Sequence, residues 1–297
     1  MRSGFDAPEI SEIFIDIQHQ NELLENFRKE VHKEGLFGLI ETWPEKLVPL
    51  FKPIIPHLEG VRRIVFAPNA YGHLLPWVVI ANEAGLDIPW ITVPSLWSLE
   101  KIIKGYSPTE GPDLVVGNPT GDLDDAEQEA EDVADMLNVE PLIGSLATKK
   151  AVLERISTAR IIHLATHAKF DPDNPLETCI MLANDEVLKA RDVIYINMHP
   201  ALITLSACET GMVGSMGSDE IVGLSQAFLH AGATTLLVSL WSVDDLMTKK
   251  FMINFYGCWI NKGLDKAEAF HKAMSEIRKK WPHTCDWAAF VLIGYWR

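Results

Sequence analysis

A histidine and a cysteine each stand just beyond an apolar stretch of this 297-residue chain. His167 follows the run Arg160–Ala165, and Cys208 follows the run Ala201–Ser206. A free thiol titrates near pH ~8.5, and a neighbouring imidazole increases its thiolate fraction or takes its proton during attack. If the two stretches lie side by side in a sheet, the pair predicts nucleophilic catalysis by Cys208 with His167 as the base.

Taken singly, these residue types have simpler interpretations. An isolated cysteine is most often an inert core residue. His163, in the middle of the first run, is predicted to be a hydrogen-bonded core histidine rather than a second base. No two of the four cysteines form a CxxC pair, so a zinc site of the usual spacing is not expected, and their number is typical of a reduced, cytoplasmic protein. The remaining cysteines lie within apolar patterns and are predicted to be structural: Cys179, Cys258 and Cys285.

Alternating strands and helices are expected to position the histidine and the cysteine. The runs 201–206 and 234–240 are almost wholly apolar, as expected of strands that are covered on both faces. The alternation predicts an α/β fold with a mostly parallel central sheet. Pro108–Pro112 is the best boundary between a smaller N-terminal half, 1–110, and a catalytic half, 111–297. Strands are predicted at 61–67, 113–117, 160–165, 179–183, 201–206 and 234–240, helices at 10–50, 126–137, 219–230, 245–259 and 264–280, and further short apolar runs occur at 77–81 and 90–93.

The chain is strongly acidic, with 26 basic and 41 acidic residues and a net charge of −15. Phosphate backbones repel such a chain, so we expect no direct nucleic-acid binding, and basic peptides or protein surfaces are favoured instead. No apolar run reaches the ~18 residues that cross a bilayer, so no membrane contact is expected. We also expect no metal or cofactor. The cluster Asp122, Asp124 and Asp125 is interpreted as the dipole-favoured start of a helix, because it lacks the alternation and closing glutamate of a calcium loop.

Two short blocks around the histidine and the cysteine resemble the signatures of the CHAT family, caspase-like cysteine proteases that are related to separase. They are HLATHA at His163–Ala168 and LSACETG at Leu205–Gly211. The resemblance extends over about residues 45–297. Its other blocks are FAPNAYGHLLPW at Phe66–Trp77, VGNPTGDLDDAEQEAEDVADML at Val116–Leu137, AFLHAGATTLLVSLWSVDD at Ala227–Asp245 and WAAFVLIG at Trp287–Gly294.

The resemblance implies a caspase-like αβα sandwich, preceded by a smaller pseudo-caspase-like or helical N-terminal half. The catalytic histidine and cysteine of the family match His167 and Cys208, and the backbone N–H groups of Ala168 and Cys208 would form the oxyanion hole. Members commonly carry glycine after the catalytic histidine, where this chain has Ala168. The N–H group is still present, so activity is expected to survive provided that the backbone at Ala168 avoids a positive φ.

Asp244 and Asp245, in the block LWSVDD, are the predicted substrate-binding residues. Separase-like proteases use an acidic residue near this block to bind a basic side chain before the scissile bond. The run 234–240 that leads to the block is expected to neighbour the run that carries Cys208. The alternative role for one aspartate is to cap the helix that begins near Leu246, so Asp245 is our first choice for the pocket. Some relatives prefer an apolar residue instead.

The resemblance as a whole implies a cytoplasmic cysteine endopeptidase that cleaves a protein substrate. A regulatory protein or sensor, of tetratricopeptide-repeat or CRISPR-effector type, is expected to activate it in bacterial defence or regulated cell death. This chain itself shows no tetratricopeptide period. The segment Thr210–Asp219 is expected to be mobile without the activator, because ordering it costs ~1–2 kcal/mol per residue.

Two alternatives to a protease follow from the same residues. One is a non-catalytic caspase-like adaptor, and the presence of both His167 and Cys208 argues against it. The other is a different thiol hydrolase or an acyltransferase that uses the same pair. Selective labelling of Cys208 by a thiol-directed electrophile would distinguish a protease from an adaptor.

Overall fold

The computed structural model describes residues 44–68, 77–169, 171, 173–206, 218–241 and 243–297, together with residue 26. Most of the helix predicted at 10–50, the whole of Cys208 and most of the segment Thr210–Asp219 lie outside these residues. None of the described helices is long and apolar enough to cross a membrane.

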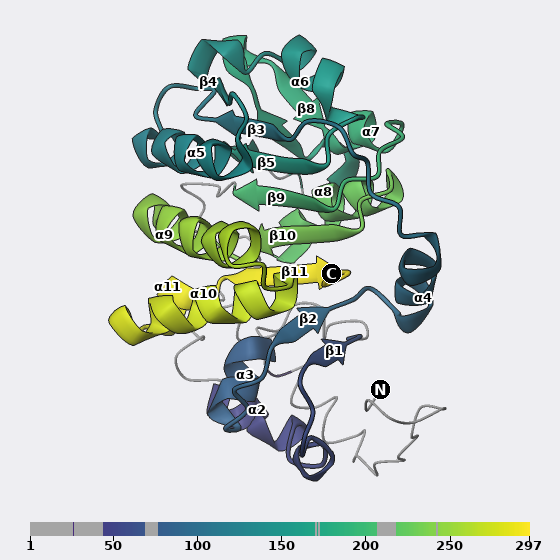
Figure 1. The fold of residues 1–297 in the computed structure, drawn as a ribbon, viewed down its shortest axis with the longest axis vertical. Coiled ribbons are helices and arrows are strands. Elements are labelled where there is room, and N and C mark those ends of the chain that lie inside the picture. The colour runs from purple at the N-terminus through teal and green to yellow at the C-terminus, as the bar shows by residue number, and fades with distance from the viewer. Residues whose placement is uncertain are drawn as a thin grey trace.

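Among the described residues, eight strands form a central sheet in the order β1–β2–β11–β10–β9–β5–β3–β4 (Figure 1). Paired neighbours run parallel, except that β10 and β11 are antiparallel. A smaller antiparallel sheet has the order β6–β7–β8. The strands are β1 (Ile64–Phe66), β2 (Trp90–Thr92), β3 (Leu114–Gly117), β4 (Leu142–Ile143), β5 (Ile161–Ala165), β6 (Ala168–Lys169), β7 (Cys179–Met181), β8 (Val187–Lys189), β9 (Leu202–Ser206), β10 (Thr235–Ser239) and β11 (Phe290–Gly294).

Helices cover both faces of the central sheet, so the predicted αβα sandwich with a mostly parallel sheet is confirmed (Figure 1). Side chains of a strand alternate between its faces. Ile161 of β5 therefore joins the hydrophobic cluster of α5, α9 and α10, and Ile162 joins that of α6, α7 and α8. The helices are α2 (Pro44–Leu47), α3 (Trp77–Glu83), α4 (Leu96–Gly105), α5 (Asp124–Leu137), α6 (Lys149–Ile156), α7 (Ala190–Val193), α8 (Ser218–His230), α9 (Asp245–Tyr256), α10 (Lys266–Lys280) and α11 (Thr284–Trp287).

The strands predicted from continuous apolar runs are present. The runs 201–206 and 234–240 form β9 and β10, which pair with each other. Of the two short runs of undetermined type, 77–81 belongs to α3 and 90–93 contains β2. The run at 179–183 forms β7, in the smaller sheet. Strands β1 and β2 extend the same sheet as β11, and the division of the chain near residue 110 stays a prediction.

The last two long helices begin at aspartate caps. Asp244 caps α9, and Asp265 caps α10 by accepting the N–H of Glu268 at 3.0 Å. Between these helices, Gly263 has a φ of +67°, a conformation that glycine adopts without strain. The two helices predicted at 245–259 and 264–280 are therefore separated at Gly263, and a π-helical turn at Gly257–Asn261 continues α9.

Gly117 ends β3 where the sheet packs closely against α5. A β-carbon at this position would lie 2.4 Å from the Cβ atom of Ala130 and 2.8 Å from Cδ1 of Ile143. Both distances are far below van der Waals contact, so the helix rests directly on the strand backbone. This close approach fixes the point from which the loop after β3 leaves the sheet.

We expect Gly117→Ala to lower the free energy of unfolding by about 1–3 kcal/mol, because the added methyl group overpacks this contact. Chemical denaturation followed by circular dichroism measures the change. Gly105→Ala is the matched control, since a β-carbon there meets no atom within 4 Å and alanine is the better helix former. A Gly117→Ala protein as stable as this control would contradict the close packing.

Candidate active site

The parallel pairing of β5 with β9 aligns the ends of the two strands that precede His167 and Cys208 in the sequence. Ala165 lies opposite Ser206, and the N–H of Thr166 donates to the carbonyl oxygen of Ser206 at 3.2 Å. His167 is two residues beyond Ala165, and Cys208 is two residues beyond Ser206. The two strands are therefore neighbours, which is the condition that the predicted pair requires. The position of Cys208 itself lies outside the described residues, so its approach to His167 stays a prediction.

Asp122 lies against the His167 imidazole. Both of its carboxylate oxygens are 3.1 Å from Nε2 of His167, and the hydroxyl of Thr120 donates to its Oδ1. The hydrogen bond from Thr120 is the main reason that the pKa of Asp122 is lowered; burial opposes it, and the contact with His167 lowers the pKa further. The side chain of Asp122 is 63% exposed and that of His167 is 20% exposed. An ionised carboxylate therefore holds a ring that is largely covered by protein.

The contact with Asp122 determines which ring nitrogen of His167 remains available as a base. An ionised carboxylate only accepts hydrogen bonds, so Nε2 of His167 is the donor and Nδ1 of the neutral ring is the acceptor. A base oriented in this way is suited to take a proton from a thiol that lies at Nδ1. The sequence predicts Asp122 only as part of the start of a helix, so this role was not predicted. Its position in the loop after β3, the strand that pairs with β5, is the signal that could have found it.

The loop that carries Asp122 is fastened to both neighbouring elements. Asn118 is buried in the left-handed region with a φ of 46°, which asparagine tolerates better than most residues. Its N–H donates to the carbonyl oxygen of Ala165 at 2.9 Å. Its side chain accepts the N–H of Leu123 at 2.9 Å and donates to Glu127 at 3.0 Å. The loop is thus tied to β5 on one side and to the first turn of α5 on the other.

Ala168 begins β6 directly after the histidine, and its φ is not positive. The alanine therefore meets the backbone condition that activity was expected to need. The N–H of Met181 donates to the carbonyl oxygen of His167 at 2.8 Å, so the next pair, Ala168 with Ile180, is a non-hydrogen-bonded pair of the antiparallel ladder. In such a pair the N–H points away from the partner strand. The use of this N–H as an oxyanion donor stays a prediction.

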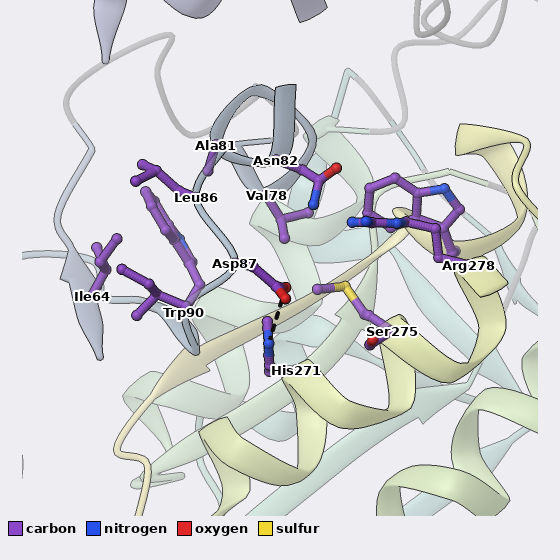
Figure 2. Close-up of a pocket in the computed structure, with 13 residues that line it drawn as sticks. Ile64, Val78, Ala81, Asn82, Leu86, Asp87, Trp90, His271, Ser275 and Arg278 are labelled. Carbon is purple, nitrogen blue, oxygen red and sulfur yellow. Dashed lines mark ion pairs between the residues drawn. The ribbon is translucent and has the colours of Figure 1, made fainter. Parts of the chain in front are cut away.

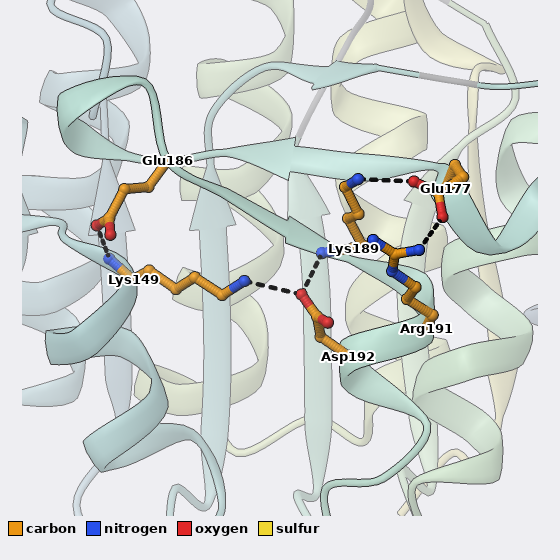
Figure 3. A network of polar contacts seen from close by, with 6 residues as sticks. All are labelled: Lys149, Glu177, Glu186, Lys189, Arg191 and Asp192. Atoms are coloured by element: carbon orange, nitrogen blue, oxygen red, sulfur yellow. Dashed lines mark hydrogen bonds and ion pairs between the residues drawn. The ribbon is translucent and has the colours of Figure 1, made fainter.

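A network of charged side chains fastens the smaller sheet to its surroundings (Figure 3). Lys149 of α6 pairs with Asp192 of α7 at 2.8 Å. Glu177 accepts hydrogen bonds from Lys189 of β8, at 2.6 Å, and from Arg191 of α7. Through Glu177 these contacts join β8 to α7, and β7 connects β8 to β6, the strand that leaves His167. The network therefore supports the backbone on the far side of the histidine.

The two aspartates predicted to bind substrate have different surroundings at the start of α9. Asp244 is the helix cap, and its Oδ1 accepts the N–H groups of Leu246 and Met247 at 3.1 and 3.3 Å. Asp245 is half-buried, and burial is the main reason that its pKa is raised. The Asp244 carboxylate raises that pKa further, whereas His167 acts in the opposite direction. Asp245 thus lies within electrostatic range of His167, as a pocket residue beside the histidine would.

His163 is a core residue, as predicted. It is fully buried, with Nε2 3.0 Å from Oε1 of the buried Glu129 of α5, and its ring packs edge to face on Tyr256 at 5.5 Å. The alignment of the contact with Glu129 falls outside hydrogen-bond geometry. In place of the expected hydrogen bond, the two side chains make a close buried contact that joins β5 to α5.

Two of the three cysteines predicted to be structural are free and buried in the described part of the chain, namely Cys179 and Cys258. Burial raises the pKa of the Cys179 thiol, against smaller opposing effects of nearby lysines. A buried thiol with a raised pKa is a poor nucleophile. The side chain of Cys285 lies outside the described residues.

Comparison with known proteins places the chain in a family. Residues 48–295 match the CHAT domain family. Tetratricopeptide repeat protein 28 of Homo sapiens is 25% identical over 296 residues, which cover 78% of this chain and 12% of that protein. The protein of the same name from Mus musculus is 26% identical over 300 residues, with the same coverage. The chain thus spans about 12% of the length of these relatives.

Two solved structures share the fold at low sequence identity. The Saccharomyces cerevisiae separase–securin complex superposes with a TM-score of 0.56 and 14% identity, over 96% of this chain and 23% of that chain. The Arg-specific cysteine proteinase gingipain R superposes with a TM-score of 0.52 and 11% identity, over 93% of this chain and 75% of that chain. The fold is that of the caspase-like proteases, and the family match over most of its length shows that the chain belongs to the CHAT domain family.

Proposed function

We propose that this chain is the catalytic domain of a cysteine endopeptidase. Cys208 is the nucleophile, His167 is the base, and Asp122 orients the imidazole. The observation that carries the proposal is the 3.1 Å contact between Asp122 and Nε2 of His167. It lies just beyond the end of β5, which is level with the end of β9, the strand that precedes residue 208 in the sequence. Membership of the CHAT family and the caspase-like fold support it.

Peptide cleavage in this site would proceed by acyl transfer. Nδ1 of His167 takes the proton of the Cys208 thiol while the sulfur bonds to the substrate carbonyl carbon. The N–H groups of Ala168 and Cys208 stabilise the oxyanion. The imidazolium, held by Asp122, then protonates the leaving amine as the C–N bond breaks. Water, deprotonated by the same ring, hydrolyses the thioester, and the proton returns to the departing sulfur.

The proposed substrate has a basic side chain before the scissile bond, bound by Asp245. Carboxylates gather around this position, since Asp244 and Asp125 both act on the pKa of Asp245. A negative field of this kind attracts arginine or lysine. Gingipain R, which shares the fold, is Arg-specific, and this supports the assignment.

A regulatory protein partner completes the proposal. The curated relatives are tetratricopeptide repeat proteins, of which this chain matches only a small part, and the related separase structure holds securin. A repeat-containing segment or chain is therefore the proposed regulator. Action in the cytoplasm, a CRISPR-effector partner and a role in bacterial defence stay expectations from the resemblance.

We expect Cys208→Ala and His167→Ala each to abolish peptide cleavage without unfolding the protein, measured with the regulator present and with circular dichroism as the folding check. A thiol-directed electrophile should label Cys208 in preference to the buried Cys179 and Cys258. Cleavage by Cys208→Ala at the wild-type rate would rule out the mechanism. A folded protein that never cleaves and shows no preferred thiol would instead be the adaptor.

We expect Asp122→Asn to lower kcat about 10-fold. This is a smaller effect than the loss of a general acid or base itself, because the Asp122 carboxylate is mostly exposed. The amide no longer stabilises the imidazolium, whereas KM should change little. Asp124→Asn is the matched control, since it removes the same charge from an exposed neighbour that does not contact His167. Equal rates for the two variants would show that Asp122 does not orient the base.

We expect Asp245→Asn to lower kcat/KM for arginine and lysine substrates by about 10-fold, or about 1.4 kcal/mol, on a peptide library. Asp244→Asn is the control, because asparagine also caps helices. Because the pKa of Asp245 is raised, its carboxylate is protonated at a higher pH than that of an ordinary aspartate. The preference for basic residues should therefore be present at neutral pH and, on acidification, be lost at that higher pH. Cleavage after leucine or methionine, with basic residues rejected, would exclude this pocket.

A further inference from the structure

Asn118, the first residue after β3, is a buried asparagine whose four polar atoms all have partners. It is 2% exposed. Its N–H donates to the carbonyl oxygen of Ala165 at 2.9 Å, and its own carbonyl oxygen accepts the N–H of Gly121 at 3.2 Å. Its side-chain oxygen accepts the N–H of Leu123 at 2.9 Å, and its side-chain nitrogen donates to Glu127 at 3.0 Å. These bonds hold the loop in one arrangement, because breaking one leaves a polar atom of a buried residue unpaired.

Asparagine suits this position for two independent reasons. A backbone N–H only donates and a carboxylate only accepts, so the side chain must offer an acceptor to Leu123 and a donor to Glu127. An amide has both, whereas the aspartate carboxylate has no donor and leucine has neither. The second reason is the φ of 46° at Asn118, a left-handed conformation that asparagine tolerates better than most residues.

The bond to Leu123 places Asp122, the residue that contacts His167. The N–H of Leu123 belongs to the peptide group that joins it to Asp122, so Asn118 holds the backbone of Asp122 directly. The contact with His167 cannot do this by itself, because the Asp122 carboxylate is 63% exposed and ion pairs at such exposure contribute little free energy. The buried hydrogen bonds therefore place the carboxylate, and the carboxylate then holds the imidazole.

We propose that Asn118 is a positioning residue, which fixes Asp122 against His167 and thereby sets the rate of the cleavage proposed above. Because Asn118 is buried, it touches neither substrate nor the reacting atoms and acts only through the Asp122 carboxylate. Its bond to Ala165 gives the strands that deliver the aspartate and the histidine one shared fixed point. The effect on rate rests on the proposed function, whereas the placement of Asp122 can be measured without any cleavage.

The first test measures the placement of Asp122 in Asn118→Gly, a variant that removes the side chain without straining a positive φ. The hydrogen bond from Thr120 and the contact with His167 both lower the pKa of Asp122. If the loop is released, these contacts weaken, so the Asp122 pKa, followed by ¹³C NMR of its carboxyl carbon, should rise toward that of an ordinary aspartate. An Asp122 pKa that keeps its wild-type value would overturn the proposal.

Two controls accompany this measurement. Asn138→Gly is the matched variant, because Asn138 has a φ of 56° and ends the same helix, α5, ~21 Å from its start. It should leave the Asp122 signal as in the wild type. Within each spectrum, the carboxyl signal of Asp87, which contacts His271 of α10 at 3.3 Å (Figure 2), should not change between variants. An equal rise of the Asp122 pKa in both glycine variants would overturn the proposal.

The second test measures cleavage with the regulator present. Asn118→Gly should lower kcat by at most the ~10-fold expected of Asp122→Asn, with KM little changed, because it acts through that carboxylate. The two changes combined should be no slower than Asp122→Asn alone, whereas losses that multiply would show that Asn118 acts elsewhere and overturn the proposal. If the wild-type protein cleaves nothing, the proposed function fails, and the NMR result alone decides whether Asn118 positions Asp122.

An exchange of groups between Asn118 and Glu127 tests the hydrogen bond itself. Asn118→Asp sets a second carboxylate against Glu127, so it should raise the Asp122 pKa and lower kcat as Asn118→Gly does. Adding Glu127→Gln restores a donor and an acceptor, with the same net charge on the pair, and should move both readouts back toward wild type. This arm also decides the question if Asn118→Gly does not fold. A double variant no better than Asn118→Asp alone would overturn the proposal.

Discussion

The parallel register between β5 and β9 is the constraint on which the proposed site depends. Five residue pairs, from Ile161 with Leu202 to Ala165 with Ser206, hold the two strands, and every one of these residues is buried. A slip of one residue would exchange the two faces of a strand and move side chains into the wrong hydrophobic cluster. The packing on both faces of the sheet therefore fixes the level at which His167 leaves β5.

The same constraint brings in the third residue of the site. Gly117 of β3 lies opposite Ala165 of β5, so the loop that carries Asp122 leaves the sheet at the level of the histidine. The absence of a side chain at Gly117 lets α5 approach the strand, and Asn118 ties the turn to β5. The contact between Asp122 and His167 is thus a consequence of strand pairing and backbone packing rather than of local sequence.

The parts of the fold that were predictable from the sequence are those with a local signal. Continuous apolar runs identify β9 and β10, and helical spacing with an acidic first turn identifies α5. A five-residue apolar run such as 77–81 has no measurable period, so its helical state could not be decided. Lys266 shows the same limit: it is fully buried and donates to the carbonyl oxygen of Ala201 at 2.9 Å, whereas a lysine in a helical pattern indicates an exposed face.

Of the site, residue types and resemblance supplied His167, Cys208 and the aspartate pair, but not the division of roles between them. That Asp244 caps α9 while Asp245 is half-buried within electrostatic range of His167 depends on the direction in which the helix starts. The Asp122 contact joins residues 45 positions apart, and no spacing in the sequence reports it. Contacts of this kind are set by strand order, and the sequence alone did not give the order β9–β5–β3.

Strand direction also explains why two chemically different regions share one edge of the sheet. β11 is antiparallel to β10, and β2 is parallel to β11. The first residue of β2, Trp90, therefore lies at the edge where β9 and β10 end, as does Trp287, just before β11. One part of this edge carries the carboxylates of Asp122 and Asp245, and another carries the Trp90 and Trp287 rings and Arg278. Without the reversal at β11, Trp90 would lie at the opposite edge of the sheet from the proposed catalytic site.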